Sequence, residues 1–176
     1  MKKICIVFLT CAIIILSAVG IGLFENESRT EYLRIHIRAD SNGYEDQSVK
    51  YKVKEAVVEY LTPFIAECKT IADAENLLSV RLDDIEEVAD KVLKENGFSY
   101  SSEARINNES FPTRKYGGVV LESGFYDALI INLGSGSGDN WWCVVYPPLC
   151  FTEGNGNYVY RSKILDIIND FLNREK

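Results

Sequence analysis

The chain has 176 residues, of which 47% are hydrophobic and 26% charged, and its formal net charge is −7. This length and hydrophobic fraction fit one globular domain with a core and a short additional segment. The acidic balance argues against nucleic-acid binding, which needs lysine and arginine to neutralise phosphates, and against adsorption to anionic lipid headgroups. The single histidine, His36, excludes a metal site made of several histidines, and no spacing of acids or cysteines predicts a metal or a cofactor.

The N-terminus carries an export signal. Lys2 and Lys3 precede an uncharged apolar run over residues 4–24, long enough to cross about 30 Å of hydrocarbon as a helix. The lysines favour a cytoplasmic N-terminus with the remainder exported. Small residues at 18 and 20 suit cleavage of a signal peptide, whereas the continuing apolar run suits an uncleaved anchor. We therefore expect a signal peptide or membrane anchor (1–24), a spacer (25–31) and a single extracytoplasmic domain (32–176).

The domain opens with a predicted strand. Residues 33–39 alternate apolar and polar side chains, as in a strand with one buried face. His36 lies on the polar face of this pattern, between two arginines, so we expect its ring to be solvated. Polar residues 40–46 then form a turn that leads into a helix.

Two amphipathic helices should follow. Apolar residues recur at helical spacing over residues 49–68, and Pro63 is expected to kink or restart this helix. Thr70 begins a second apolar stripe that continues to the stop at residues 96–97. We expect the acids on the other face of this second helix to be solvated; they are Asp83, Asp84, Glu86, Glu87 and Asp90.

The second half of the domain is mostly predicted strand. Residues 102–107 suit an edge strand, 111–118 a loop, 119–121 a short strand, and 126–133 and 141–146 longer strands. The glycine-rich residues between the last two strands are expected to form a flexible hairpin connection, and a final helix carries one apolar stripe. The fold class is therefore α+β: a mostly antiparallel sheet with amphipathic helices packed on one face, preceded by an N-terminal transmembrane or signal helix.

Cys143 and Cys150 admit two interpretations. A thiol nucleophile would need a neighbouring base, and His36 is the only imidazole in the chain. A disulfide is favoured, because a Pro-Pro pair between the cysteines can reverse the chain and export leads to an oxidising compartment. Two free thiols remain the alternative.

The two tryptophans lie side by side on the predicted strand 141–146. Strand alternation points Trp141 and Trp142 to opposite faces of the sheet, and Tyr146 shares a face with Trp142. Either both faces of this strand are covered, or one presents aromatic residues to a partner. Exposed tryptophan and tyrosine are residue types that dominate the binding energy of interfaces.

Three segments resemble the stage II sporulation protein R family, in the family's order: 33–42 with 45–47, 111–117, and 138–151. Asp40 stands where the family is expected to have asparagine. The resemblance implies a signalling protein of endospore-forming bacteria, made in the forespore and exported into the space between the two membranes. It implies as partner a membrane-embedded aspartic protease of the mother cell that processes the sigma-E precursor, and it implies no enzymatic activity.

We expect the partner surface to include Arg114, Lys115, Tyr116, Trp141, Trp142 and Tyr146. Two other classes of function stay open. One is an exported hydrolase acting on cell-wall material, with His36 or a carboxylate as its base. The other is a glycan-binding module in which the tryptophans stack on sugars.

Overall fold

The computed structural model describes residues 31–116, 118–151 and 158–174. The expected signal peptide or anchor, residues 1–24, lies outside these ranges, as do most of the expected spacer and the loop 152–157. Among the helices in the described ranges, none is long and apolar enough to span a bilayer.

The centre of the fold is a mixed four-stranded sheet with the order β2-β5-β1-β6. Strand β1 (Leu33–Arg38) runs parallel to β5 (Gly124–Leu133) and antiparallel to β6 (Asn140–Tyr146). Strand β2 (Ser102–Phe111) pairs antiparallel with β5 along its whole length. The sheet is mostly antiparallel, as predicted, and the one parallel pair joins strands that are far apart in the sequence.

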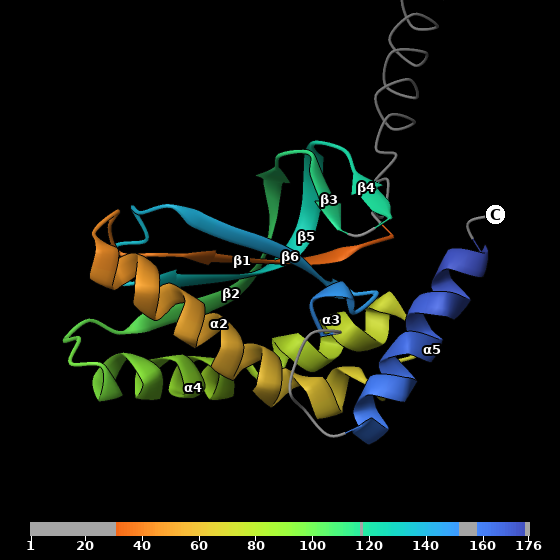
Figure 1. The fold of residues 1–176 in the computed structure, drawn as a ribbon, viewed down its shortest axis with the longest axis horizontal. Coiled ribbons are helices and arrows are strands. Elements are labelled where there is room, and N and C mark those ends of the chain that lie inside the picture. The colour runs from red at the N-terminus through yellow and green to blue at the C-terminus, as the bar shows by residue number, and fades with distance from the viewer. Residues whose placement is uncertain (1–30, 117, 152–157, 175–176) are drawn as a thin grey trace, which may run out of the picture.

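Helices cover one face of the sheet, which confirms the predicted arrangement (Figure 1). They are α2 (Tyr44–Ile65), α3 (Ile71–Ser79), α4 (Leu82–Glu95) and α5 (Tyr158–Arg174). Fully buried apolar side chains of α2, α3 and α4 form one core with the apolar residues of β1 and β5, namely Leu33, Ile35, Ile37, Leu129, Ile131 and Leu133.

Two expectations about where the helices break were wrong: α2 does not restart at Pro63, and the second helix is not continuous. Helix α2 continues through Pro63 to Ile65, because the proline stands in the last turn and removes only one backbone hydrogen bond. The apolar stripe that follows is divided at Val80 and Arg81 into α3 and α4. The predicted start and stop are correct: Thr70 and its partner Asp73 form a capping box, and Gly97, with a φ of 83°, follows α4.

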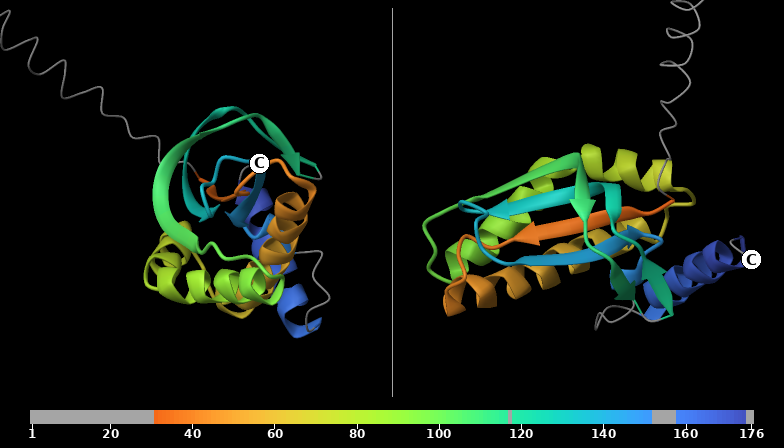
Figure 2. Two further views of the ribbon diagram at one scale, coloured as in Figure 1. Left: turned by 90° about the vertical axis from the view of Figure 1, so that its left-hand side faces the viewer. Right: turned by 90° about the horizontal axis from the view of Figure 1, so that it is seen from above.

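A two-stranded ribbon lies over the other face of the sheet (Figure 2). It consists of β3 (Arg114–Tyr116) and β4 (Val119–Leu121), paired antiparallel. The sequence pattern predicted a loop over residues 111–118, but Phe111 ends β2, and after Pro112 and Thr113 the residues Arg114–Tyr116 form β3. Strand β2 curves so that its end leads directly into this ribbon (Figure 2).

The glycine-rich connection is not a hairpin, because β1 lies between the two strands that it joins. It crosses the end of β1 and is bound to the turn there. The Gly138 N–H donates to the Ala39 carbonyl at 2.8 Å, and the Ser135 N–H donates to Asp40 Oδ1 at 2.6 Å. An asparagine at position 40 offers the same acceptor oxygen, so the departure from the family pattern preserves this bond.

Gly138 lets the connection approach the β1 turn closely. A Cβ at this position would lie 2.3 Å from the Ser41 carbonyl oxygen, which is fixed backbone. We expect Gly138→Ala to lower the free energy of unfolding by about 1–3 kcal/mol, measured by urea denaturation. Gly118→Ala is the matched control, because nothing lies within 4 Å of its Cβ position. Equal stability of the two variants would contradict the described crossing.

Candidate partner-binding site

The sheet face opposite the helices carries a cluster that we call the arginine face: Arg34, His36, Arg38, Arg105, Glu109 and Trp142. These residues share a face because the apolar members of β1 alternate with them and point to the helices. The register of the sheet places His36 between Ile130 of β5 and Trp142 of β6. Residues 70 or more positions apart in the sequence are thereby brought into contact.

Arg34 is the most enclosed residue of the arginine face. Its side chain is 0% exposed, and its guanidinium carbon lies 4.2 Å from the centre of the Phe111 ring and 4.8 Å from that of Tyr126. Its Nη2 donates to Tyr116 Oη at 2.7 Å, whereas Nε and Nη1 have no hydrogen-bond partner. Aromatic rings, rather than a carboxylate, surround this charge in the described part of the chain.

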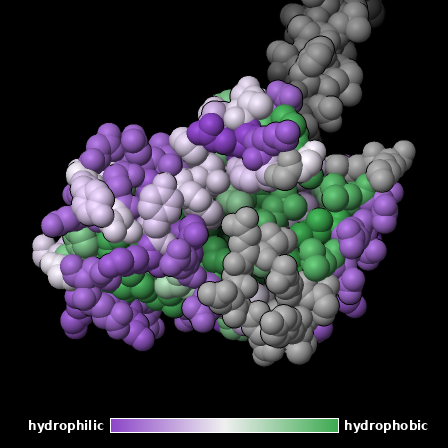
Figure 3. Space-filling view, in the orientation of Figure 1, coloured by the Kyte–Doolittle hydropathy of each residue, from purple (hydrophilic) through white to green (hydrophobic). Residues whose placement is uncertain are grey.

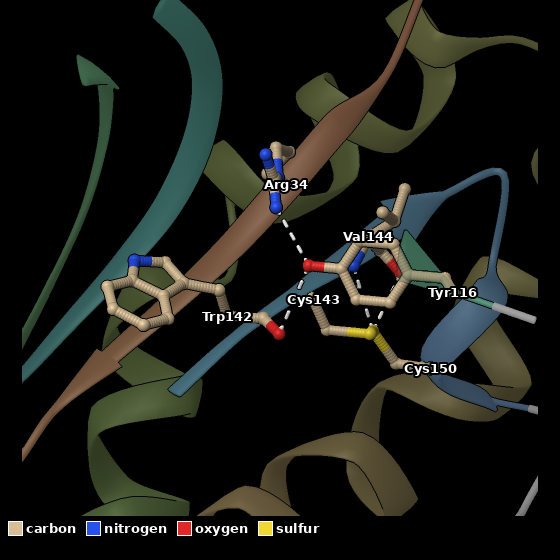
Figure 4. The surroundings of a disulfide bond; sticks show 6 residues. All are labelled: Arg34, Tyr116, Trp142, Cys143, Val144 and Cys150. Carbon is tan, nitrogen blue, oxygen red and sulfur yellow. Dashed lines mark hydrogen bonds between the residues drawn. A yellow bond between two sulfur atoms is a disulfide. The ribbon is translucent and has the colours of Figure 1, made fainter. Parts of the chain in front are cut away.

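Tyr116 connects the ribbon to the sheet. Its hydroxyl accepts the hydrogen bond from Arg34 and donates one to the Trp142 carbonyl at 3.3 Å (Figure 4). One hydroxyl therefore fixes β3 against both β1 and β6. The residues that flank Tyr116 on the ribbon are held at a defined place over the arginine face.

His36 is not solvated, so the prediction for this residue was wrong. It is 4% exposed, stacks on Trp142 at 5.5 Å between ring centres and meets the edge of Phe111 at 5.7 Å. The end of β2 and the Trp142 ring cover the polar face of β1, which the periodicity predicted to be exposed to water. Its Nδ1 lies 3.2 Å from Glu109 Oε2.

Burial lowers the pKa of the His36 ring below the ordinary 6.5, and the charge of Arg38 acts in the same direction, while Asn140 and Glu109 oppose the shift. Glu109 also accepts a 2.6 Å bond from Arg38 Nη2, and Arg105 lies 3.6 Å from its other oxygen. Glu109, together with Glu103 at 3.7 Å from Arg105, thus neutralises part of this face.

Trp142 and Arg114 meet at the border between sheet and ribbon. The guanidinium carbon of Arg114 lies 4.5 Å from the Trp142 ring centre. Trp142 is half-buried, whereas Arg114 and its neighbour Lys115 are exposed. The structure thus brings three of the six expected partner residues together, Arg114, Tyr116 and Trp142, with Lys115 beside them.

The other two expected residues lie elsewhere. Trp141 is on the helix side of β6, where the Lys54 ammonium stands 5.9 Å from its ring centre. A register shift between Leu33 and Arg34 leaves Val145 as an extra residue in β6. Tyr146 therefore also turns to the helix side and is buried there, and it does not share a face with Trp142 as alternation predicted.

The structure joins Cys143 and Cys150 in a disulfide. The bond holds the short helix η1 (Leu149–Phe151) beside β6, so that the Val144 N–H donates to Cys150 Sγ at 3.0 Å (Figure 4). Together with the Tyr116 bond to Trp142, this contact covers outward backbone groups of β6. Cys68 is buried and free, and burial raises the pKa of its thiol to about 11.

The sequence pattern did not predict the contacts of three residues that stabilise the fold: Arg34, Glu109 and Lys50. Lys50 is 1% exposed, and its ammonium donates to Gln47 Oε1 at 2.6 Å and to the Asp139 carbonyl at 2.9 Å. Burial lowers the pKa of Lys50, and the Asp139 charge opposes the shift. The lysine and Arg34 both belong to helical or strand patterns in which a charge predicts exposure, so periodicity gave no sign of them.

The described chain is thus an α+β domain with a cationic, aromatic cluster between the sheet and the ribbon and, within the described ranges, no group of three or more metal ligands. It belongs to the stage II sporulation protein R family, whose model matches residues 29–155, and it is a sporulation-related protein.

A similar protein is Stage II sporulation protein R of Bacillus subtilis (strain 168), 35% identical over 128 residues. The matched region covers 72% of this chain and 57% of that relative, so it spans little more than half of the relative's length. No solved structure matches the chain.

The hydroxyl of Tyr116 is expected to stabilise the fold through Arg34. Tyr116→Phe leaves a third nitrogen of a fully buried guanidinium without a hydrogen bond, so we expect the free energy of unfolding to fall by about 1.5–3 kcal/mol. Urea denaturation measures the change. Tyr44→Phe, at a side chain that is 88% exposed, is the control and should leave stability unchanged. A Tyr116→Phe variant as stable as the control would contradict the role given to this bond.

His36 is expected to make stability depend on pH. The unfolded chain binds a proton near pH 6.5, whereas the folded ring resists it because its pKa is lowered. Stability is therefore lost as the pH falls below 6.5, until the folded ring is also protonated. Urea denaturation at about pH 7.5 and about pH 5 measures the loss. His36→Gln should show a smaller loss; an equal loss in both proteins would contradict the prediction, since the chain has no other histidine.

Proposed function

We propose that this protein is an exported signalling protein of sporulation that acts between the forespore and mother-cell membranes. There it switches on a membrane-embedded aspartic protease, which then processes the sigma-E precursor. Membership of the family supports the sporulation role. The lysines and the apolar run of residues 4–24 support export, and the finer role follows from the resemblance. In this proposal residues 1–24 direct export, 25–31 are a spacer and 32–176 carry the signal.

The observation that carries the proposal is the exposed pair Arg114 and Lys115 on a ribbon held in place by Tyr116. Arg114 stacks on a half-buried tryptophan, and Lys115 is free to meet a partner. Arginine and tryptophan are residue types that most often dominate interface energies. Figure 3 shows the polar side chains gathered over the ribbon, above a hydrophobic area that extends toward α5.

The proposed action is binding rather than catalysis. A general base must reach a substrate, but the His36 ring is enclosed by Phe111, Trp142 and Glu109. The Trp142 ring, which a sugar would need as a stacking surface, is already in contact with His36 and Arg114. These contacts favour a protein partner over a cell-wall substrate or a glycan.

Arg114→Ala is expected to reduce processing of the sigma-E precursor in sporulating cells by about tenfold or more, because interface arginines of this kind contribute about 2 kcal/mol. Immunoblotting of precursor and product measures the effect. Arg114 is exposed, so the variant should fold normally and unfold in urea at the same concentration as the wild type. Glu87→Ala, on the helix side of the molecule, is the control. Normal processing in a stable Arg114→Ala protein would remove this residue from the proposed surface.

A further inference from the structure

The two outer strands of the sheet differ in how completely their backbone groups are covered. On β6, Tyr116 and Cys150 cover outward groups of Trp142 and Val144. On β2, the Ser102 N–H donates to Asp90 Oδ1 at 2.6 Å, and the Ala104 N–H donates to Glu86 Oε1 at 2.6 Å. These two acids were expected to be solvated. Instead, their side chains extend from α4 and accept hydrogen bonds from the backbone at the edge of the sheet. Uncapped strand edges pair readily with other chains, and such caps prevent it.

The capping stops halfway along β2. Strand β2 pairs with β5 without a register shift from Ser102 to Phe111, so alternate residues point their N–H and C=O groups away from the sheet. Because Ser102 and Ala104 point outward, Ile106, Asn108 and Ser110 point outward as well. For these three residues the described part of the chain supplies no backbone partner. We call the segment 106–110 the open edge.

The surroundings of the open edge indicate the chemistry of a strand that would fit it. On the helix side, Phe125 lies opposite Ser110 and is 67% exposed. On the opposite side lies Arg105, whose side chain is about one-third exposed and already lies 3.7 Å from Glu103 Oε2 and 3.6 Å from Glu109 Oε1. An added strand would therefore place apolar residues beside Phe125 and uncharged polar residues beside Arg105 and its two glutamates.

We propose that the open edge binds an extended segment of the partner protein as a fifth strand of the sheet, with apolar and uncharged polar side chains in alternation. The proposal rests on the proposed function, since it names the way in which the same partner is held. The open edge ends only four residues before Arg114, so a segment that pairs with β2 continues directly onto the ribbon. Backbone hydrogen bonds supply the affinity, and the exposed ring of Phe125 selects apolar side chains.

Amide hydrogen exchange by NMR, with synthetic peptides that tile the extracytoplasmic segments of the protease, tests the proposal. In the free protein the amides of Ile106, Asn108 and Ser110 should exchange fast, while those of Arg105, Asn107 and Glu109 are protected by β5. One peptide should slow the first set and leave the second unchanged. Slow exchange of all six amides without peptide, or protection that rises with the concentration of the chain alone, would overturn the proposal; the latter would assign the edge to a second copy.

Two substitutions at Asn108 distinguish the contribution of its backbone N–H to peptide binding from that of its side chain. Asn108→Pro removes the outward N–H but no bond to β5, and should weaken peptide binding about tenfold. Asn108→Ala keeps the N–H and should bind as the wild type does. Should Asn108→Pro fail to fold, Asn108→Lys places a charge on the edge beside Asp127 and should weaken binding similarly.

The outcomes also distinguish this inference from the proposed function. Equal binding by Asn108→Pro and Asn108→Ala overturns the strand-pairing inference. So does a peptide that changes only the signals of Arg114 and Trp142, although that result supports the proposed function. Loss of precursor processing in Arg114→Ala together with normal processing in Asn108→Pro likewise retains the partner surface and rejects the open edge.

Discussion

The sheet face opposite the helices is covered because it contains one buried charge, that of Arg34. Moving a guanidinium out of water costs several kcal/mol unless other groups offset the loss. Arg34 is fully buried on the central strand, and its environment consists of Phe111, Tyr126 and the Tyr116 hydroxyl. Those three groups come from β2, β5 and the ribbon, so all of these elements must close over β1 together. The constraint explains why a strand with an arginine, a histidine and another arginine on one face is covered rather than solvated.

The same closure positions the surface that is proposed to meet the partner. Tyr116 fixes β3, and β3 in turn presents Arg114 and Lys115 beside Trp142. At the other end of β6, the glycine-rich connection and Lys50 hold the start of the strand against the turn after β1. The disulfide holds η1 at the far end of the strand. Both ends of β6 are therefore held in place, and Trp142 lies between them at the border of sheet and ribbon.

Local periodicity predicted the elements well, because each depends on which residues alternate or recur within a few positions. It placed β1, β5, β6, the capping box at Thr70 and the helix stop at Gly97 correctly. It failed where contacts between distant segments decide. His36 is buried by residues from β2 and β6, and Tyr146 changes faces at a bulge set by pairing with β1. The glycine-rich segment crosses a strand whose position in the sheet no local pattern reveals.

The central claim is that the ribbon beside Trp142 touches the protease directly, and a photoreactive amino acid at position 115 tests it most directly. Lys115 is exposed, so the replacement leaves the arginine face intact. The account predicts that illumination of sporulating cells joins this position to the extracytoplasmic part of the protease, and that the same probe at position 87, on the helix side, captures none. Capture from position 87 but not from 115 would contradict the account.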